Sequence, residues 1–278
     1  MARLPLVLEP VSLDLAWNDP EANLKGMEAA LKERLGRGAD PGERLFIFPE
    51  LTLTAFATKN PGTFSADPPE GAVLAALGLA RKYKTAVAFG FPEKNPEAPG
   101  KPFNALLLAR PDGSIAGLYR KMHLFTAGRS PESDFFSAGE SGILVEYRGW
   151  SIGLSICFDL RFSRLYHAYA RAGADLILAP ACWIGGPHKS AQFRTLAAAY
   201  AVLSQAYVAA VNRSGKDPFF EYDGSAHVFS PFCEPVLKDG SCRLDEAVLS
   251  ECRKMRVRPA DRENYPFLLV ASRRAAFQ

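Results

Sequence analysis

The sequence predicts an α/β protein in which apolar strands alternate with amphipathic helices. Continuous apolar segments such as RLFIFPE and DLILAP are typical of strands that are covered on both faces. Segments with helical periodicity separate these strands along the chain. At 278 residues the chain can bury one large core, so we expect a single domain over residues 1–278.

The first predicted unit is β-α-β. MARLPLVLEP supplies the first core strand, and Asp19-Pro20 is a typical helix start. The residues at helical spacing after it are Leu24, Met27, Leu31 and Leu35. Gly36 and Gly38 end this helix of about 17 residues. RLFIFPE then forms a strand with a carboxylate at its carboxyl end.

The alternation continues through the rest of the chain. We expect a helix over residues 71–83, the strand TAVAFGF, and the pair FNALLLAR and SIAGLYRK joined by the hairpin turn PDG. WSIGLSIC then forms a strand, FSRLYHAYARAGA a helix and DLILAP a strand. An Ala-rich helix over 188–204 and the strand AYVAAVN follow. Residues 213–242 are expected to add two strands, around SAHVF and PVLK, and residues 243–278 a C-terminal arm.

Composition and charge exclude several classes of protein. The chain is 48% hydrophobic and 23% charged, which is ordinary for a soluble globular protein. Its apolar runs are shorter than the roughly 18 residues of a membrane span. Pro5 and Glu9 interrupt the first apolar stretch, which therefore lacks the apolar region of a signal peptide. The formal net charge is only +3 with dispersed basic residues, so neither nucleic acid nor a membrane is expected as a partner.

The cysteines do not form a recognisable framework. They are Cys157, Cys182, Cys233, Cys242 and Cys252. An odd number without a CxxC pair fits neither a disulfide scaffold nor a zinc knuckle, so we expect no metal and no cofactor. Free thiols indicate a reducing compartment, which predicts a cytoplasmic protein.

Three polar side chains follow apolar strands, where α/β folds commonly place chemistry. Glu50 follows LFIFP, Lys121 follows LYR, and Cys157 follows GLSI. Each has a structural alternative, because such residues are often a solvated carboxylate, a surface lysine and a core thiol. Together they would supply the nucleophile, the proton acceptor and the oxyanion-stabilising cation of acyl transfer. A thiol of ordinary pKa is mostly protonated at neutral pH, so it needs such a base and cation.

A Cys-His pair is a weaker alternative. His167 lies inside the helix that follows Cys157 and is expected to be structural. His123 follows Lys121 by two residues, so on an extended chain it shares the same face. His123 therefore either lines the same pocket or lies on the surface.

Three motifs carry a resemblance to a known family. FPELTLTAF, YRKMHLF and GLSICFDLRF resemble the Glu, Lys and Cys motifs of the nitrilase, or carbon-nitrogen hydrolase, superfamily in their order and intervals. The resemblance extends from the first strand to beyond residue 240. It implies a four-layer α-β-β-α sandwich and a triad of Glu50, Lys121 and Cys157. PESDFFSAG resembles the segment with a second glutamate, here Glu132, although a solvated loop carboxylate is the alternative.

The resemblance also implies a mechanism with a thioester intermediate. Glu50 would accept the thiol proton, while Lys121 and the backbone N–H of Phe158 would stabilise the oxyanion. Glu132 would help to orient the substrate or the base. Asp159 and Arg161 are expected to form a salt bridge that braces the turn after the nucleophile.

The substrate class is suggested by finer similarities. AWNDPEANL, FPELTLTAFA, KMHLF and YDGSAHVFSP resemble the omega-amidases, which hydrolyse short dicarboxylate monoamides such as 2-oxoglutaramate. Cys182 and Trp183 in LAPACWIGGP fall where the family has a substrate-lining loop, although Trp183 could equally be a core aromatic residue. An N-carbamoyl amine, a nitrile or a deaminated peptide amide is an alternative substrate. A catalytically silent binding protein on the same fold is the alternative outside enzymes.

Two positions depart from the family pattern. Relatives commonly have Arg-Ala-x-Glu-Asn before the strand AYVAAVN, whereas residues 200–204 here are Tyr-Ala-Val-Leu-Ser. Ala55 stands where many relatives have Gly. Because members of the family associate, we expect a homodimer or a larger homo-oligomer, and MRVRPADRENYPFLL resembles an arm that could reach a neighbouring subunit.

Overall fold

Two β-sheets form the centre of the protein. The computed structural model describes residues 3–36, 40–56, 71–126, 131–255 and 268–271. Within these ranges the first sheet has the strand order β13-β1-β2-β3-β4-β5 and the second has the order β12-β9-β8-β7-β6-β14. The strands of the first sheet are β1 (Val7–Pro10), β2 (Arg44–Ile47), β3 (Ala86–Glu93), β4 (Phe103–Ala109), β5 (Ile115–Arg120) and β13 (Cys242–Arg243). Those of the second are β6 (Gly142–Tyr147), β7 (Trp150–Leu154), β8 (Leu176–Ala181), β9 (Tyr207–Asn212), β12 (Ala226–Phe229) and β14 (Leu268–Ala271).

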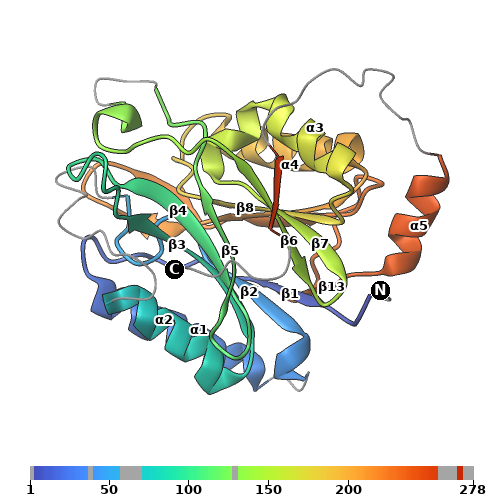
Figure 1. Ribbon diagram of the computed structural model, residues 1–278, viewed down its shortest axis with the longest axis horizontal. Coiled ribbons are helices and arrows are strands. Elements are labelled where there is room, and N and C mark those ends of the chain that lie inside the picture. Colours follow the sequence, from blue (N-terminus) through green and yellow to red (C-terminus); the bar gives the residue numbers. More distant parts are fainter. Residues whose placement is uncertain (1–2, 37–39, 57–70, 127–130, 256–267, 272–278) are drawn as a thin grey trace.

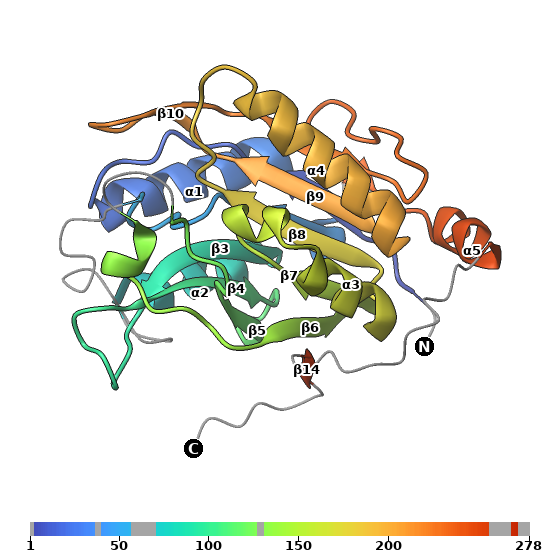
Figure 2. The same ribbon diagram turned by 90° about the horizontal axis from the view of Figure 1, so that it is seen from above.

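Helices cover the outer face of each sheet. The helices of the described ranges are α1 (Pro20–Leu35), α2 (Gly71–Tyr83), α3 (Ser163–Ala172), α4 (Lys189–Ser204) and α5 (Glu246–Lys254). Figure 1 shows α1 and α2 below the first sheet and α3 and α4 above the second, while α5 lies at one end. Figure 2 shows α4 running alongside β9 in this layer. The predicted four-layer α-β-β-α sandwich is therefore confirmed.

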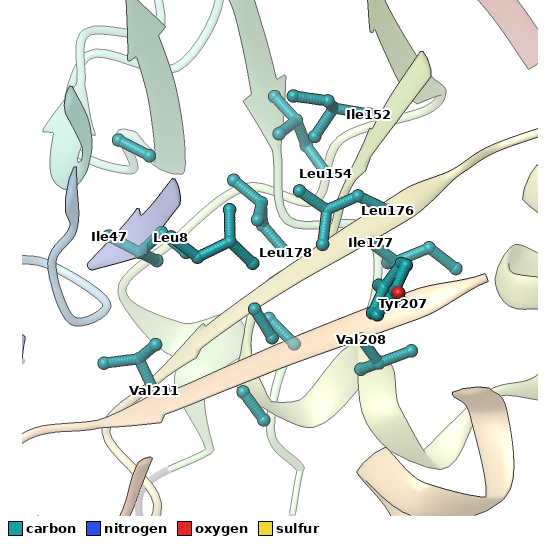
Figure 3. Close-up of a cluster of buried hydrophobic side chains, with 14 of the residues drawn as sticks. Leu8, Ile47, Ile152, Leu154, Leu176, Ile177, Leu178, Tyr207, Val208 and Val211 are labelled. Carbon is teal, nitrogen blue, oxygen red and sulfur yellow. The ribbon is translucent and has the colours of Figure 1, made fainter. Parts of the chain in front are cut away.

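The alternation of side chains along β2 explains why its sequence is continuously apolar. Ile47 belongs to the core cluster between the two sheets, whereas Phe46 and Phe48 pack in the cluster beneath α1 and α2. Figure 3 shows Leu8 and Ile47 of the first sheet in the same cluster as Leu178 of the second. Each such fully buried side chain contributes about 1.5–3 kcal/mol to folding, which holds the two sheets face to face.

Local signals placed several elements correctly. The side chain of Asp19 accepts a hydrogen bond from the N–H of Ala22 at 2.9 Å, and Pro20 opens α1 as predicted. Gly36 caps the end of α1, whereas Gly38 lies outside the described residues. At the PDG turn Gly113 has φ +79°, a conformation that glycine adopts without steric cost, and β4 and β5 form the expected antiparallel pair.

Other elements differ from the prediction. β6 was not anticipated, and β10 (Ser214–Lys216) and β11 (Glu221–Asp223) form an unpredicted two-stranded sheet. The strand expected around PVLK is wrong, because this segment makes only isolated bridges such as Phe229–Pro235. Strands of three residues are too short to show a period-two pattern.

The C-terminal region contains more structure than an arm. α5 begins at the fourth residue of this region, Glu246, and β14 pairs in parallel with β6 of the same chain. The remainder of the segment that resembles a subunit-crossing arm, residues 256–267, lies outside the described residues. Within the described ranges, none of the helices combines the length and apolarity needed to cross a bilayer.

The last turn of α4 contains the segment that departs from the family pattern. Tyr200 stacks on Tyr166 with ring centroids 3.9 Å apart. Val202 and Leu203 are 45% and 58% exposed. An aromatic stack and two apolar surface residues therefore stand where relatives have a charged pair.

Candidate active site

Glu50 lies in a tight turn three residues after β2. Its carboxylate is buried and accepts the backbone N–H of Cys182, after β8, at 2.7 Å. Leu51, the next residue, has φ +47°. The turn packs so closely on β3 that a Cβ atom at Gly90 would lie 2.3 Å from the Leu51 nitrogen. A glycine on β3 therefore allows the backbone beside Glu50 to reach its position.

Lys121 brings two carboxylates together. It follows β5 directly, and its Nζ atom lies 2.7 Å from Glu50 Oε1 and 2.8 Å from Glu132 Oε2. Glu132 opens the short 3₁₀ helix η3 (Glu132–Asp134) and also accepts the N–H of Phe125 at 2.8 Å. The side chains of Lys121, Glu50 and Glu132 are at most 1% exposed. The solvated-loop alternative for Glu132 is therefore wrong.

Cys157 is held in an unusual backbone conformation. It is the first residue of the 3₁₀ helix η4 (Cys157–Arg161), which follows β7, and its φ is +45°. Positive φ is uncommon in a non-glycine residue and costs of the order of 1–3 kcal/mol. Such strain clusters at functional sites, because the surrounding fold must impose it. The strand end carrying Cys157 is thus a sharp turn that presents a thiol.

The buried groups perturb each other's protonation. Burial raises the pKa of the Cys157 thiol well above its ordinary value; Glu50 adds to the increase and Lys121 opposes it. Burial disfavours the charge on Lys121, but Glu132 and Glu50 outweigh that effect and hold its pKa well above the usual range. Burial likewise raises the pKa of Glu132, against the opposing charge of Lys121. The thiol, the ammonium and both carboxylates therefore lie within one electrostatic cluster.

Asn104 belongs to the cluster and was missed by the sequence analysis. It lies on β4, is fully buried, and its Nδ2 is 2.8 Å from Oε1 of Glu50 and 2.8 Å from Oε1 of Glu132. The available signal was a lone amide in the otherwise apolar strand FNALLLAR. Its partners lie 54 and 28 residues away in the sequence, so a local pattern cannot identify them.

The expected salt bridge between Asp159 and Arg161 is wrong. Asp159 is fully buried and points inward. Its carboxylate accepts hydrogen bonds from Ile156 N at 2.9 Å and Tyr119 Oη at 2.7 Å, and lies 2.7 Å from His123 Nδ1. Asp159 thus links the turn that carries Cys157 to Tyr119 and His123, which lie two residues before and two residues after Lys121.

Arg161 points the other way, toward α4. Its Nη2 donates to Oε1 of Gln192 at 2.7 Å, and its guanidinium lies 4.9 Å from the ring centre of Trp183. Along a short 3₁₀ helix, residues two apart do not share a face, which explains why the carboxylate and the guanidinium diverge.

His123 and Phe158 form an aromatic group beside the turn. The side chain of His123 is 24% exposed, and its ring stacks on Phe162 with ring centroids 3.9 Å apart. The ring of Phe158 contacts those of Phe125 at 5.2 Å and Phe162 at 5.4 Å. His167 lies within α3 and is partly buried.

Cys182 and Trp183 follow β8 and are both buried. Cys182 contacts Glu50 twice, because its thiol also lies 3.3 Å from the Glu50 carbonyl oxygen. Asn212 Oδ1 accepts the N–H of Trp183 at 2.7 Å, and Asn212 Nδ2 donates to the Trp183 carbonyl oxygen at 2.9 Å. The indole packs on Phe193 at 5.3 Å. Trp183 therefore has the surroundings of a core aromatic residue on one side and contacts Arg161 on the other.

The site has the composition of a group-transfer centre. Among the described residues, no three His, Cys, Asp or Glu side chains are arranged to hold a metal ion. A thiol beside two carboxylates and an ammonium can exchange a proton and stabilise negative charge on a reacting carbonyl group.

The fold and this site agree with a match to a protein family. Residues 9–240 match the carbon-nitrogen hydrolase family, and the chain therefore belongs to that family of enzymes. The omega-amidase YafV of Yersinia enterocolitica is 34% identical over 218 residues, which cover 77% of this chain and 75% of that protein. The deaminated glutathione amidase of Escherichia coli O157:H7 is 33% identical over 164 residues, 59% of this chain and 60% of that protein.

Solved structures support the fold. Nit3 of Saccharomyces cerevisiae, described as a member of branch 10 of the nitrilase superfamily, superposes with a TM-score of 0.81 at 24% identity. The superposition covers 91% of this chain and 94% of Nit3. The family match over residues 9–240, together with the amidase relatives, confirms the predicted resemblance to the nitrilase superfamily and the predicted enzyme class.

Proposed function

We propose that this protein hydrolyses a small aliphatic amide to a carboxylic acid and ammonia through a thioester on Cys157. The observation that carries this proposal is the buried cluster in which Glu50 and Glu132 share Lys121 beside a thiol on a strained turn. Glu50 is the general base, Lys121 and the N–H of Phe158 stabilise the oxyanion, and Glu132 helps to orient the substrate or the base. Phe158 is the second residue of η4, where backbone N–H groups lack partners within the helix.

The first half of the reaction forms the thioester. Glu50 accepts the proton of the Cys157 thiol as the sulfur bonds to the amide carbon, and the carbonyl oxygen becomes an oxyanion. Glu50 then gives this proton to the amide nitrogen. The C–N bond breaks, ammonia leaves and the acyl group remains on sulfur.

The second half releases the acid. Glu50 accepts a proton from water while the water oxygen attacks the thioester carbon. The C–S bond then breaks, the proton returns to sulfur, and the carboxylic acid departs. One amide and one water are consumed for each acid and ammonia formed.

A dicarboxylate monoamide is the substrate that we favour. The 34% identity to an omega-amidase over three quarters of both chains supports this choice, together with the four sequence segments that resemble that branch. A deaminated peptide amide is the second candidate, supported by the 33% identity to deaminated glutathione amidase.

Assembly and location complete the proposal. The exposed apolar residues Val202 and Leu203 on α4 support a homodimer or larger homo-oligomer. All five cysteines are free, which supports a reducing, cytoplasmic compartment.

An amide panel tests the proposal. Ammonia release would be measured with 2-oxoglutaramate, deaminated glutathione, N-carbamoyl-β-alanine and a short aliphatic nitrile. We expect 2-oxoglutaramate to have the highest kcat/KM, and an acyl adduct on Cys157 to appear by intact mass after rapid quenching. Turnover of the carbamoyl compound without any of 2-oxoglutaramate would replace the substrate assignment. Absence of both turnover and adduct, with Cys157→Ala indistinguishable from wild type, would support the binding-protein alternative.

A further inference from the structure

The amide of Asn104 lies between the two carboxylates of the site. Its side chain projects from β4 with no exposure to solvent. The Nδ2 group has two hydrogens, and each carboxylate offers an Oε1 atom at 2.8 Å. One amide group therefore supplies a donor to both glutamates at once.

The orientation of this amide is fixed by its neighbours. Turning it over would place Oδ1 against Oε1 of Glu50 and Oε1 of Glu132, where oxygen would face oxygen without a hydrogen. In the observed orientation Oδ1 is buried and has no hydrogen-bond donor among the described residues. A buried acceptor without a partner is unfavourable, so folding alone gives little reason for an asparagine in this apolar strand. The contacts of Nδ2 provide the reason.

The two carboxylate oxygens of Glu50 accept different numbers of hydrogen bonds. Oε1 accepts from both Lys121 Nζ and Asn104 Nδ2, which fills the two lone pairs of that oxygen. Oε2 accepts only from the N–H of Cys182 within the described part of the chain. The remaining capacity of Glu50 to take a proton therefore lies on Oε2.

Glu132 shows the complementary pattern. Its Oε2 accepts from Lys121 Nζ and the N–H of Phe125, whereas Oε1 accepts only from Asn104 within the described ranges. Lys121 and Asn104 together thus hold the two carboxylates side by side with one open acceptor position on each.

We propose that Asn104 is a positioning residue that occupies Oε1 of Glu50, so that the proton of Cys157 is received and returned at Oε2. This inference rests on the proposed function, because it specifies the atom through which Glu50 acts. The Sγ–H bond breaks as the O–H bond forms at Oε2, and the same proton later passes from Oε2 to the departing nitrogen. The N–H of Cys182 orients Oε2 throughout, and Asn104 keeps the carboxylate from rotating.

Asn104→Leu is the direct test, because it keeps a side chain of similar size and removes both donors. We expect kcat on the best amide of the panel to fall about 100-fold with KM changed less than about 3-fold, since the substrate still binds but the base is misplaced. The acid limb of the kcat/KM profile should also move to higher pH. Without the N–H donors of Asn104 the Glu50 carboxylate is easier to protonate, so its basic form disappears at a higher pH. The expected shift of the acid limb is on the order of one pH unit.

The charged and titratable groups that face this carboxylate come from several elements. They are Lys121 after β5, Glu132 on η3, Cys157 on η4 and Cys182 after β8. None of them is altered in Asn104→Leu, so a shift of the acid limb reports on the lost amide donors. A purely structural role would lower activity at every pH alike and leave the limb in place.

Asn95→Leu is the matched control. Asn95 is a buried asparagine after β3 whose Nδ2 donates to Ser137 Oγ at 2.9 Å and whose Oδ1 accepts the N–H of Glu97. We expect a loss of thermal stability, a kcat within about 2-fold of wild type after correction for folded protein, and an unchanged acid limb.

Asn104→Asp is the second variant if Asn104→Leu does not fold. It keeps the shape of the side chain and sets a third carboxylate against the other two, which should also move the acid limb to higher pH. A wild-type kcat and an unmoved acid limb in the variant that folds would overturn the inference alone. Absence of ammonia release by the wild-type protein on every amide would instead overturn the proposed function, and this inference with it.

Discussion

β2 has a buried charge cluster at each end. Near its start Arg44 donates to Glu9 at 2.6 Å, and Arg34 lies 3.3 Å from the same carboxylate. After its end Glu50 and Glu132 share the single ammonium of Lys121. Apart from Arg34, whose side chain is 19% exposed, the members of both clusters are buried, and both clusters are built from residues far apart in the sequence.

The two clusters differ in what they can exchange. Arginine does not lose its proton in proteins, so the cluster around Glu9 has fixed charges and acts as a brace between β1, β2 and α1. The cluster around Lys121 has an excess of carboxylate and lies beside a thiol, so it can accept and return a proton. Burial of an ion pair therefore does not distinguish a structural cluster from a catalytic one. The presence of a group that can change its protonation does distinguish them.

The largest expected effect is the loss of activity when a thiol is removed beside Lys121 rather than near the arginine cluster at the other end of β2. Cys157→Ala should lower kcat/KM by at least about 10⁴-fold, because the nucleophile is removed while the fold remains. Ammonia release with circular dichroism checks this. Cys242→Ala is the control, since Cys242 is a buried cysteine on β13 opposite Leu8, near the arginine cluster. Activity of Cys157→Ala within 100-fold of wild type would contradict the assignment.

The next prediction concerns two substitutions, each of which removes the cation of an ion pair at one end of β2. Lys121→Met and Arg44→Met should each lower the free energy of unfolding by about 3–5 kcal/mol, because each leaves a buried carboxylate with a missing partner. Urea unfolding measures this loss. Per folded molecule, only Lys121→Met should also abolish ammonia release. An inactive but folded Arg44→Met protein would show that the brace and the site are not separable.

The pH dependence of stability tests the thiols of the site. Burial and the charge of Glu50 raise the pKa of both Cys157 and Cys182. In the unfolded chain thiols ionise near pH 8.5, so above that pH the unfolded state loses protons that the folded state keeps. The free energy of unfolding should therefore fall above about pH 8.5, by up to about 1.4 kcal/mol per unit for each thiol. Urea unfolding from pH 7.5 to 10 should give a shallower decline in Cys182→Ala, and identical slopes would refute the prediction.

The smallest prediction concerns strain in the turn beyond Glu50. Ala55 has φ +57°, a conformation that costs an L-residue about 1–2 kcal/mol. Ala55→Gly relieves this cost but gives the unfolded chain more freedom, about 0.5–1 kcal/mol. We expect a net gain of about 0.5 kcal/mol, measured as a higher midpoint of thermal unfolding. A lower midpoint would mean that packing of the Ala55 methyl group stabilises the fold by more than the positive φ destabilises it.

Much of the architecture was predictable because strands covered on both faces have continuous apolar sequences. RLFIFPE, WSIGLSIC and DLILAP each correspond to a central strand, and the helices between them begin and end within a few residues of their predicted limits. β10 and β11 could not be predicted, since three-residue strands carry no period and are fixed by their neighbours. The same applies to β14, whose pairing with β6 joins segments far apart in the chain.

The candidate site was predictable only in part, for a similar reason. Glu50, Lys121 and Cys157 follow strands, so the topology that places strand ends together also places these residues together. Asn104 lies within a strand and acts through its side-chain amide, and Asp159 turns inward rather than toward Arg161. Their partners depend on side-chain direction in three dimensions, which neither spacing nor composition specifies.

β14 has a consequence for the solubility of shortened forms of the chain. It covers the outer edge of the second sheet by pairing with β6 from Gly142 to Val145. A chain that ended before Leu268 would leave the backbone N–H and C=O groups along that edge of β6 without their partner strand. Exposed edges of this kind add strands from other molecules, so such a truncation should promote intermolecular β-sheet growth and precipitation.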